Sequence, residues 1–242
     1  MSVLEGKVAI VTGGSGGYGR GIAAVLSREG ARVWVTGRDR SRIERAASAA
    51  GATPVVADAT AASDWDRLVQ AVLDREGRID ILVNNAGGGV RIAPVGEQTD
   101  EEIEASIALN LTSAILGCRR VAPVMQRQRS GTIINISSVC ATEAWPGWSV
   151  YSAAKAGLLQ FSRCLYTELR PFGVRVTCLM PSWGATGFQE AARLPVDGEE
   201  INAKKIQPEE LGETVAHICA MPAHLAVEQM TIWPLVQAVE PL

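Results

Sequence analysis

The chain has 242 residues, 47% of them hydrophobic and 20% charged, and a formal net charge of −3 at pH 7. These values are those of an ordinary globular chain, and without a basic excess we expect no nucleic-acid partner. Neither a charged segment leading into an apolar core at residues 1–5 nor an apolar run of about 18 residues is found, so we expect no signal peptide and no membrane span.

Length and cysteine content favour a one-domain cytoplasmic protein. An α/β chain of this length is commonly one domain, so we expect a single domain over residues 1–242. The five cysteines are odd in number and never spaced Cys-x-x-Cys, which indicates reduced thiols rather than a disulfide framework. His217 and His224 have no partners at metal-ligand spacing, so we predict no metal site.

A glycine-rich turn follows the first predicted strand. Residues 7–12 form an apolar, β-branched run typical of a buried strand, and a helical pattern covers residues 20–29. Between them, Gly14-x-Gly16-x-x-Gly19 has the general dinucleotide-binding spacing. Glycines permit the tight turn and let backbone N–H groups approach a pyrophosphate, whose negative charge the helix dipole favours. We therefore expect this turn to bind a nucleotide.

Positive charge follows the second predicted strand, residues 32–36. An acidic residue about 20 positions beyond the glycines would bind the 2′-hydroxyl of NAD, whereas an arginine would suit the 2′-phosphate of NADP. Arg38 lies at this place, with Arg40 and Arg42 close behind, so we favour NADP(H). The alternative is that the arginines are a solvated helix start and that Asp39 binds the ribose.

Three capping patterns mark the starts of the next helices. Each pattern places an acidic residue three positions after a serine or threonine, which can satisfy free N–H groups at a helix start. The predicted helices cover residues 41–50, 63–76 and 99–128, headed by Ser41-x-x-Glu44, Ser63-x-x-Asp66 and Thr99-x-x-Glu102.

Polar residues follow the third and fourth predicted strands, residues 53–57 and 79–83. Asp58 ends the first of them, and the polar, glycine-rich loop 84–89 ends the second. In an open α/β sheet, the loops at the carboxyl ends of the strands form the ligand crevice, so loop 84–89 is placed to meet the cofactor. An asparagine-rich turn without a ligand is the alternative.

Ser138 stands at the carboxyl end of the fifth predicted strand, residues 131–136. Trp145 and Trp148 follow on the next loop, and Trp183 lies on the loop after the sixth strand. Tryptophans on crevice loops predict an apolar or aromatic wall for a substrate. Packing between loops or subunits is an equally good interpretation.

Tyr151 and Lys155 are four residues apart on a predicted helix, residues 151–170, and therefore share one face. An ammonium group beside a phenol favours the phenolate, so we expect the pKa of Tyr151 to fall below its ordinary value of about 10. Such a phenol can exchange a proton with a reacting carbonyl or alcohol oxygen. Taken alone, the spacing also fits an ordinary surface pair.

The remaining pattern completes an alternation of strands and helices. It predicts a strand over residues 174–180, a mobile flap at about 183–207, a helix that begins at Pro208, and a last strand over residues 230–233. Alternation without repeats or linkers predicts an α/β fold. We expect a doubly wound, mostly parallel seven-stranded sheet with helices on both faces and right-handed crossovers.

Together, these motifs resemble those of the short-chain dehydrogenase/reductase family, whose fold is of the Rossmann type. The resemblance extends motif by motif from residue 5 to about residue 182. The matching elements are Thr12-Gly13-x-x-x-Gly17-x-Gly19, Asp58, Asn84-Asn85-Ala86-Gly87, Asn110, Ser138, Tyr151 and Lys155.

The resemblance implies an NADP(H)-dependent oxidoreductase that interconverts a carbonyl and an alcohol by hydride transfer. Tyr151 would give or take the proton at the substrate oxygen, and Ser138 would hydrogen-bond that oxygen. Lys155 would hold the nicotinamide ribose and keep Tyr151 acidic, while Asn110 would position a water that links Lys155 to solvent. The implied cofactor-binding residues are Gly13, Ser15, Gly17, Tyr18, Gly19, Arg38, Asp58, Asn85, Ala86, Gly87, Tyr151, Lys155 and Pro181.

The chain departs from the family pattern in two places. Ser182 follows Pro181 where the family usually has glycine, so we expect a different bend in the loop over the nicotinamide. The family's glycine-rich C-terminal segment is replaced by a sequence similar to that of NADP-dependent members acting on 3-hydroxy acids and related small alcohols.

The resemblance leaves two alternative functions open and also implies an oligomeric state. Gly16 fits the spacing of sugar-nucleotide epimerases and dehydratases, although few residues follow the sixth strand to build their C-terminal domain. A catalytically silent NADP-sensing regulator is the other alternative, which the complete catalytic set disfavours. Family members pair through long helices such as 100–128 and 151–170, so we expect a homodimer or homotetramer acting on a small-molecule substrate.

Overall fold

Seven strands form one sheet in the order β3-β2-β1-β4-β5-β6-β7, and every pair of neighbours is parallel. The structure is a computed structural model that describes residues 3–237, so the ends of the predicted domain, residues 1–2 and 238–242, lie outside the described residues. The predicted doubly wound sheet is confirmed. The strands are β1 (Val8–Val11), β2 (Arg32–Gly37), β3 (Thr53–Val56), β4 (Ile81–Asn84), β5 (Gly131–Ile136), β6 (Val174–Pro181) and β7 (Gln229–Ile232).

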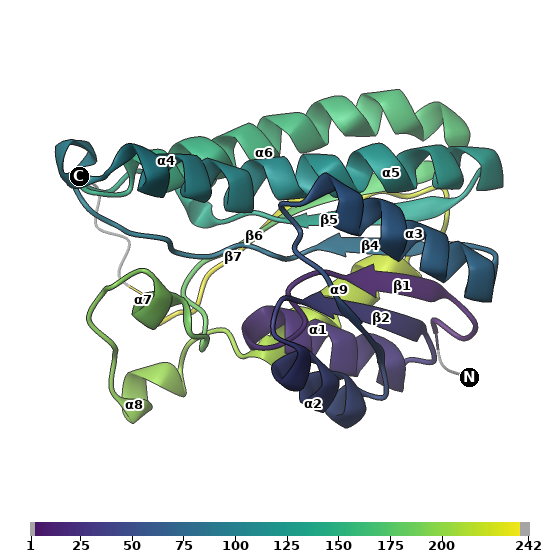
Figure 1. The fold of residues 1–242 in the computed structure, drawn as a ribbon, viewed down its shortest axis with the longest axis horizontal. Helices are drawn as coiled ribbons and strands as arrows, with labels where there is room; N and C mark the ends of the chain where they lie inside the picture. Colours follow the sequence, from purple (N-terminus) through teal and green to yellow (C-terminus); the bar gives the residue numbers. More distant parts are fainter. Residues whose placement is uncertain (1–2, 238–242) are drawn as a thin grey trace.

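Helices cover both faces of the sheet (Figure 1). One buried apolar cluster lies between the sheet and α1, α2 and α9, and a second lies between the sheet and α3, α5 and α6. The central strands β1 and β4 are buried at every position because both faces are covered, whereas the edge strands β3 and β7 are partly exposed. The helices are α1 (Gly17–Arg28), α2 (Arg40–Ala50), α3 (Ala62–Glu76), α4 (Asp100–Ile107), α5 (Ser113–Gln128), α6 (Ser149–Leu169), α7 (Phe188–Ala191), α8 (Glu199–Asn202) and α9 (Pro208–Ala220).

Only one of the three predicted capping boxes forms. Thr99 Oγ1 accepts from the backbone N–H of Glu102, and the Glu102 carboxylate accepts from the N–H of Thr99. The pattern at Ser41 was wrong, because Asp39 caps α2 instead by accepting from the N–H of Arg42 at 2.9 Å. The pattern at residue 63 was also wrong, since α3 starts at residue 62 without a side-chain cap.

The predicted helix over residues 99–128 is interrupted in its middle. Residues Ala108–Thr112 form a π-helical segment between α4 and α5. The side-chain amide of Asn110 donates to the carbonyl of Ser106 at 3.1 Å, which is the carbonyl that the N–H of Asn110 would use in an α-helix. This competition explains the wider turn, and such segments are frequent at functional sites.

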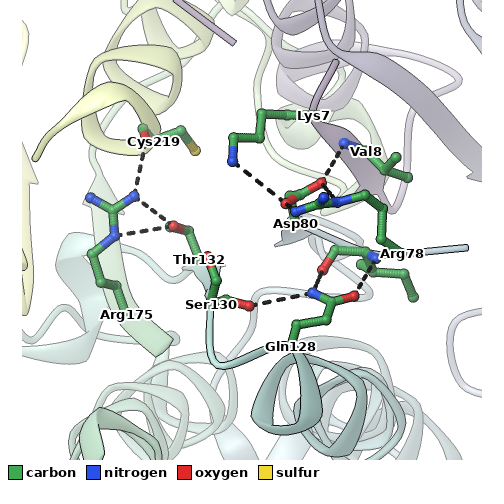
Figure 2. Close-up of polar contacts among 10 residues, drawn as sticks. Lys7, Val8, Arg78, Asp80, Gln128, Ser130, Thr132, Arg175 and Cys219 are labelled. Atoms are coloured by element: carbon green, nitrogen blue, oxygen red, sulfur yellow. Dashed lines mark hydrogen bonds and ion pairs between the residues drawn. The ribbon is translucent and has the colours of Figure 1, made fainter. Parts of the chain in front are cut away.

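A polar cluster closes the edge of the sheet where the strands begin, opposite the carboxyl ends (Figure 2). Asp80, 4% exposed, accepts from the N–H of Val8 at 3.0 Å and from Nε and Nη2 of Arg78, and Lys7 Nζ lies 3.6 Å away. Nearby, Arg175 joins Thr132 to the carbonyl of Cys219. Asp80 therefore fastens the start of β1 to the start of β4.

Asp80→Ala should lower the free energy of unfolding by about 2–3 kcal/mol, because the buried N–H of Val8 loses its acceptor and Arg78 its partner. Arg78 stays half-exposed and can be hydrated again, which limits the loss. Asp66→Ala removes an exposed carboxylate paired with Arg120 and should cost less than about 1 kcal/mol. Urea unfolding of both variants would measure this difference, and equal losses would contradict the role of Asp80.

Candidate active site

The loops after β1, β4, β5 and β6 meet at the carboxyl edge of the sheet. This edge carries the glycine-rich turn 13–19, loop 85–89, Ser138 and the segment that starts after Pro181. β1 and β4 are neighbours although two strand–helix units separate them in sequence, so the chain reverses its direction of growth here. A crevice at such a reversal is the usual ligand site of an open parallel sheet.

The glycine-rich turn has the shape of a phosphate cradle. Gly13 has a φ of +68°, and a Cβ on Gly19 would overlap the carbonyl oxygen of Gly13 and lie 2.5 Å from Asn85 Nδ2. Helix α1 begins at Gly17, earlier than predicted, and no side chain caps it at Gly16. Its first N–H groups therefore lack a side-chain acceptor, and the dipole of the helix favours an anion at this place.

Thr12 ties the turn to the loop after β4. Its Oγ1 accepts from the N–H groups of Asn85 at 3.0 Å and Ala86 at 2.9 Å, and Asn85 Nδ2 donates to the Thr12 carbonyl. These bonds hold the two loops side by side, as a cofactor site spanning both of them requires. The residues present therefore fit a bound nicotinamide dinucleotide.

The four predicted catalytic side chains are all buried at this edge. Asn110 is 1% exposed, Ser138 8%, Tyr151 7% and Lys155 4%. Gly87 lies between two of them, since a Cβ there would be 3.1 Å from Asn110 Oδ1 and 3.2 Å from Lys155 Nζ. Lys155 Nζ lies 5.6 Å from the centre of the Tyr151 ring and donates to the carbonyl of Ile136 at 3.1 Å.

Asn110 fixes the backbone beside Lys155. Its Oδ1 accepts from the N–H of Gly88 and its Nδ2 donates to the carbonyl of the same residue, both at 2.9 Å. The amide nitrogen thus donates both to the loop and to the carbonyl of Ser106, just before the π-helical segment. The side chain therefore has its own protein partners, and its predicted role in holding a water stays a prediction.

The electrostatics of the pair differ from the expectation. Burial raises the pKa of Tyr151 above its ordinary value, while hydrogen bonding to Ser138 opposes this shift. The predicted lowering by Lys155 is therefore wrong for the structure described, because burial is the largest cause of the shift and the ammonium group of Lys155 donates to Ile136. Burial also lowers the pKa of Lys155, to about 8. In this state Tyr151 is a protonated donor.

Aromatic rings surround the phenol. The ring of Trp148 lies edge-on to that of Tyr151 with centroids 5.7 Å apart, and Trp145 lies edge-on to Trp148 at 6.4 Å. Phe188 of α7 stacks on Trp148 at 5.9 Å and lies 5.4 Å from Tyr151. Trp183 is 45% exposed and forms no ring pair among the described residues. Sequence analysis missed Phe188, since its segment has no periodicity that marks an inward face.

The predicted flap, residues 183–207, contains the two short helices α7 and α8, which its composition did not predict. Inside it, Lys205 is 4% exposed, and its ammonium group contacts Asp197 at 2.7 Å and Gln189 at 2.8 Å. Ala192 packs against Gly89 so closely that Gly89 has no room for a Cβ. These contacts place Phe188 over Tyr151.

The predicted adenosine-side residues lie on neighbouring loops. Arg38 is exposed directly after β2, and Ser15 approaches Gly37 at the end of that strand. Asp58 Oδ1 accepts from the N–H and hydroxyl of Thr60 at 2.8 and 2.7 Å. The carboxylate of Asp39 caps α2 and is thereby engaged within its own turn.

Known proteins resemble this chain both in sequence and in fold. A family model described as short chain dehydrogenase matches residues 7–197. An uncharacterized oxidoreductase of Staphylococcus saprophyticus is 34% identical over 244 residues, covering 97% of this chain and all of the relative. Among solved structures, the closed form of a serine dehydrogenase with NADP+ has a TM-score of 0.88 at 29% identity, covering 97% of this chain and 98% of that one. A metagenomic short-chain oxidoreductase with NADP has a TM-score of 0.84 at 30% identity, covering 98% and 100%.

Two further findings concern residues 3–237. None of their helices is long and apolar enough to cross a membrane. Within the same range, histidine, cysteine and acidic side chains do not gather in groups of three or more that could hold a metal ion.

Proposed function

The chain belongs to the short-chain dehydrogenase family and is an oxidoreductase with a fold that binds a nicotinamide cofactor, and from this premise we propose that it interconverts a carbonyl and an alcohol with NADP(H). The observation that carries the proposal is the convergence of Asn110, Ser138, Tyr151 and Lys155 beside the glycine-rich turn. When bound, the cofactor supplies or accepts the hydride.

The side chains supply the proton and the stabilisation of charge. In reduction, Tyr151 donates its phenolic proton to the substrate oxygen, and Ser138 donates a hydrogen bond to the same oxygen. The raised pKa of Tyr151 keeps the proton in place until transfer. Charged Lys155 stabilises the phenolate that remains. Its Nζ lies next to Gly87, and in this proposal it also donates to the ribose hydroxyls.

The wild-type protein provides the direct test. Ketones, aldehydes, 3-oxo acids and alcohols should be offered with NADPH or NADP+, and turnover followed by nicotinamide absorbance. We expect reduction of at least one carbonyl class. A protein that binds NADPH but turns over none of these classes would contradict the proposed reaction.

Arg38→Ala should weaken NADPH binding about 10–100-fold and NADH binding far less, because a charge-assisted contact to the 2′-phosphate is lost. Arg45→Ala is the matched control, since Arg45 is exposed on α2 farther from the end of β2. Fluorescence titration with each cofactor measures both affinities. Equal losses for NADPH and NADH would remove Arg38 from the recognition of the phosphate.

The lowered pKa of Lys155 predicts a pH dependence. Because the ammonium form stabilises the phenolate, kcat/KM for reduction should fall as pH rises through about 8.

The contribution of Lys155 to the free energy of unfolding should change with pH in the opposite direction. Between about 8 and 10.5 the unfolded state binds more protons than the folded state, so Lys155 makes the protein more stable as pH rises through this window. Comparing wild type, Lys155→Met and the exposed Lys204→Met by pH-dependent unfolding checks this sign.

We also infer that the protein assembles as a homodimer or homotetramer. We propose that subunits pair through α5 and α6. These two helices run side by side along one outer layer (Figure 1). Light scattering after size exclusion would give the assembly state, and a monomer at micromolar concentration would contradict this inference.

A further inference from the structure

Ser182 and Gln237 lie together although 55 positions separate them in the sequence. The hydroxyl of Ser182 donates to Gln237 Oε1 at 2.5 Å, and the backbone N–H of Trp183 donates to the same oxygen at 3.3 Å. The N–H of Ser182 donates to the carbonyl of Ile232 at 2.9 Å, which extends the pairing of β6 with β7. One side-chain oxygen from the C-terminal segment thus holds two consecutive residues of the loop after β6.

This loop covers the glycine-rich turn. Gly184 has no room for a Cβ because the hydroxyl of Tyr18 occupies that place, and the Thr186 side chain would be 3.3 Å from a Cβ on Gly17. On its other side the loop is joined to the end of the flap. The N–H of Ile206 donates to the carbonyl of Trp183 at 3.0 Å, and the N–H of Ala185 donates to the carbonyl of Ile206 at 2.9 Å. A shift of residues 182–186 would therefore uncover the start of α1.

The serine at position 182 supplies the hydroxyl donor of this contact. Glycine, the usual residue after the proline in the family this chain resembles, has no hydroxyl to donate. A glutamine oxygen has two lone pairs and can accept from both Ser182 and Trp183. Gln237 is half-buried, and its bond from the Ser182 hydroxyl is partly buried, which limits competition by water at that bond.

We propose that Gln237 is a positioning residue for the cofactor site, which holds the loop 182–186 over the glycine-rich turn and slows the release of the cofactor. The inference rests on the proposed function, because the turn must bind a nicotinamide dinucleotide for the loop to retain it. Gln237 acts through Ser182 and Trp183, and its side chain need not touch the cofactor.

The test measures NADPH affinity and release rather than turnover alone. Gln237→Leu keeps the size of the side chain but removes the acceptor, and it should raise the dissociation constant for NADPH and its dissociation rate about 5–20-fold. With saturating NADPH, kcat should stay within about twofold if chemistry limits turnover. Gln237→Glu keeps an acceptor oxygen and should retain an affinity near that of wild type, which a loss of packing alone would not explain.

Two further variants make the result decisive. Gln229→Leu is the matched control, because Gln229 accepts from Arg163 on α6 and does not hold the loop. Ser182→Ala removes one donor and should weaken NADPH binding less than Gln237→Leu does, and the double variant should be no weaker than Gln237→Leu.

Three outcomes would overturn the inference. They are wild-type release rates in Gln237→Leu, equal losses in Gln229→Leu, and additive losses in the double variant. If wild type itself binds neither NADPH nor NADH, both the proposed function and the inference about Gln237 fail. If wild type binds NADPH while the variants release it at the same rate, only the role of Gln237 fails.

Discussion

Tyr151→Phe should lower kcat by about 10²–10⁴-fold and leave the affinity for NADPH nearly unchanged. The substitution removes one oxygen from a ring that lies edge-on to both Trp148 and Phe188, so the site keeps its shape but loses the phenolic proton. Single-turnover reduction with saturating NADPH isolates the chemical step, and fluorescence titration gives the cofactor affinity separately.

Tyr166→Phe is the matched control for this experiment. Tyr166 lies on the same helix, α6, but packs with the apolar cluster between the sheet and α3, α5 and α6. Its loss of a hydroxyl should leave kcat unchanged. Substantial turnover by Tyr151→Phe, or an equal fall in both variants, would remove Tyr151 from its catalytic role.

Gly19→Ala should abolish measurable cofactor binding, with an increase in the NADPH dissociation constant of about 100-fold or more. The new methyl group would overlap the carbonyl oxygen of Gly13, which is backbone and has no rotamer to escape into. The turn must open, and the N–H groups at the start of α1 then move away from the phosphates. Loss of two charge-assisted hydrogen bonds already accounts for this magnitude.

Gly96→Ala controls for the general effect of removing a glycine. Gly96 has open space around its Cβ position and lies far along the loop toward α4. It should bind NADPH as wild type does. Circular dichroism and thermal unfolding of both variants separate a local change in the turn from unfolding, and wild-type affinity in a folded Gly19→Ala variant would contradict the cradle.

The sheet and the residues gathered at its edge followed from local patterns. Apolar runs such as residues 79–83, each ending in a polar loop, determine where strands stop, and parallel pairing brings those ends together. Tyr151 and Lys155 needed only the helical period to share a face. Such features depend on neighbours in sequence, so the sequence alone could predict them.

The features that sequence analysis missed depend on tertiary contacts. Phe188 reaches Tyr151 because α7 docks against loop 85–89 through Ala192, and no local pattern records that docking. The cap of α2 is the exception, since it is a local contact: Asp39, two residues before Ser41, accepts from the N–H of Arg42. The direction of the pKa shift at Tyr151 depends on burial, which composition does not reveal.

The reversal of growth between β1 and β4 separates the loops proposed to select the cofactor from those proposed to carry the acid–base chemistry. Arg38 follows β2 on one side of this seam, whereas Ser138 and Tyr151 follow β5 on the other. With the roles proposed above, substitutions around the first three strands can change the choice of dinucleotide without moving the proposed acid–base group. Cofactor preference and substrate specificity can therefore change independently of each other during evolution.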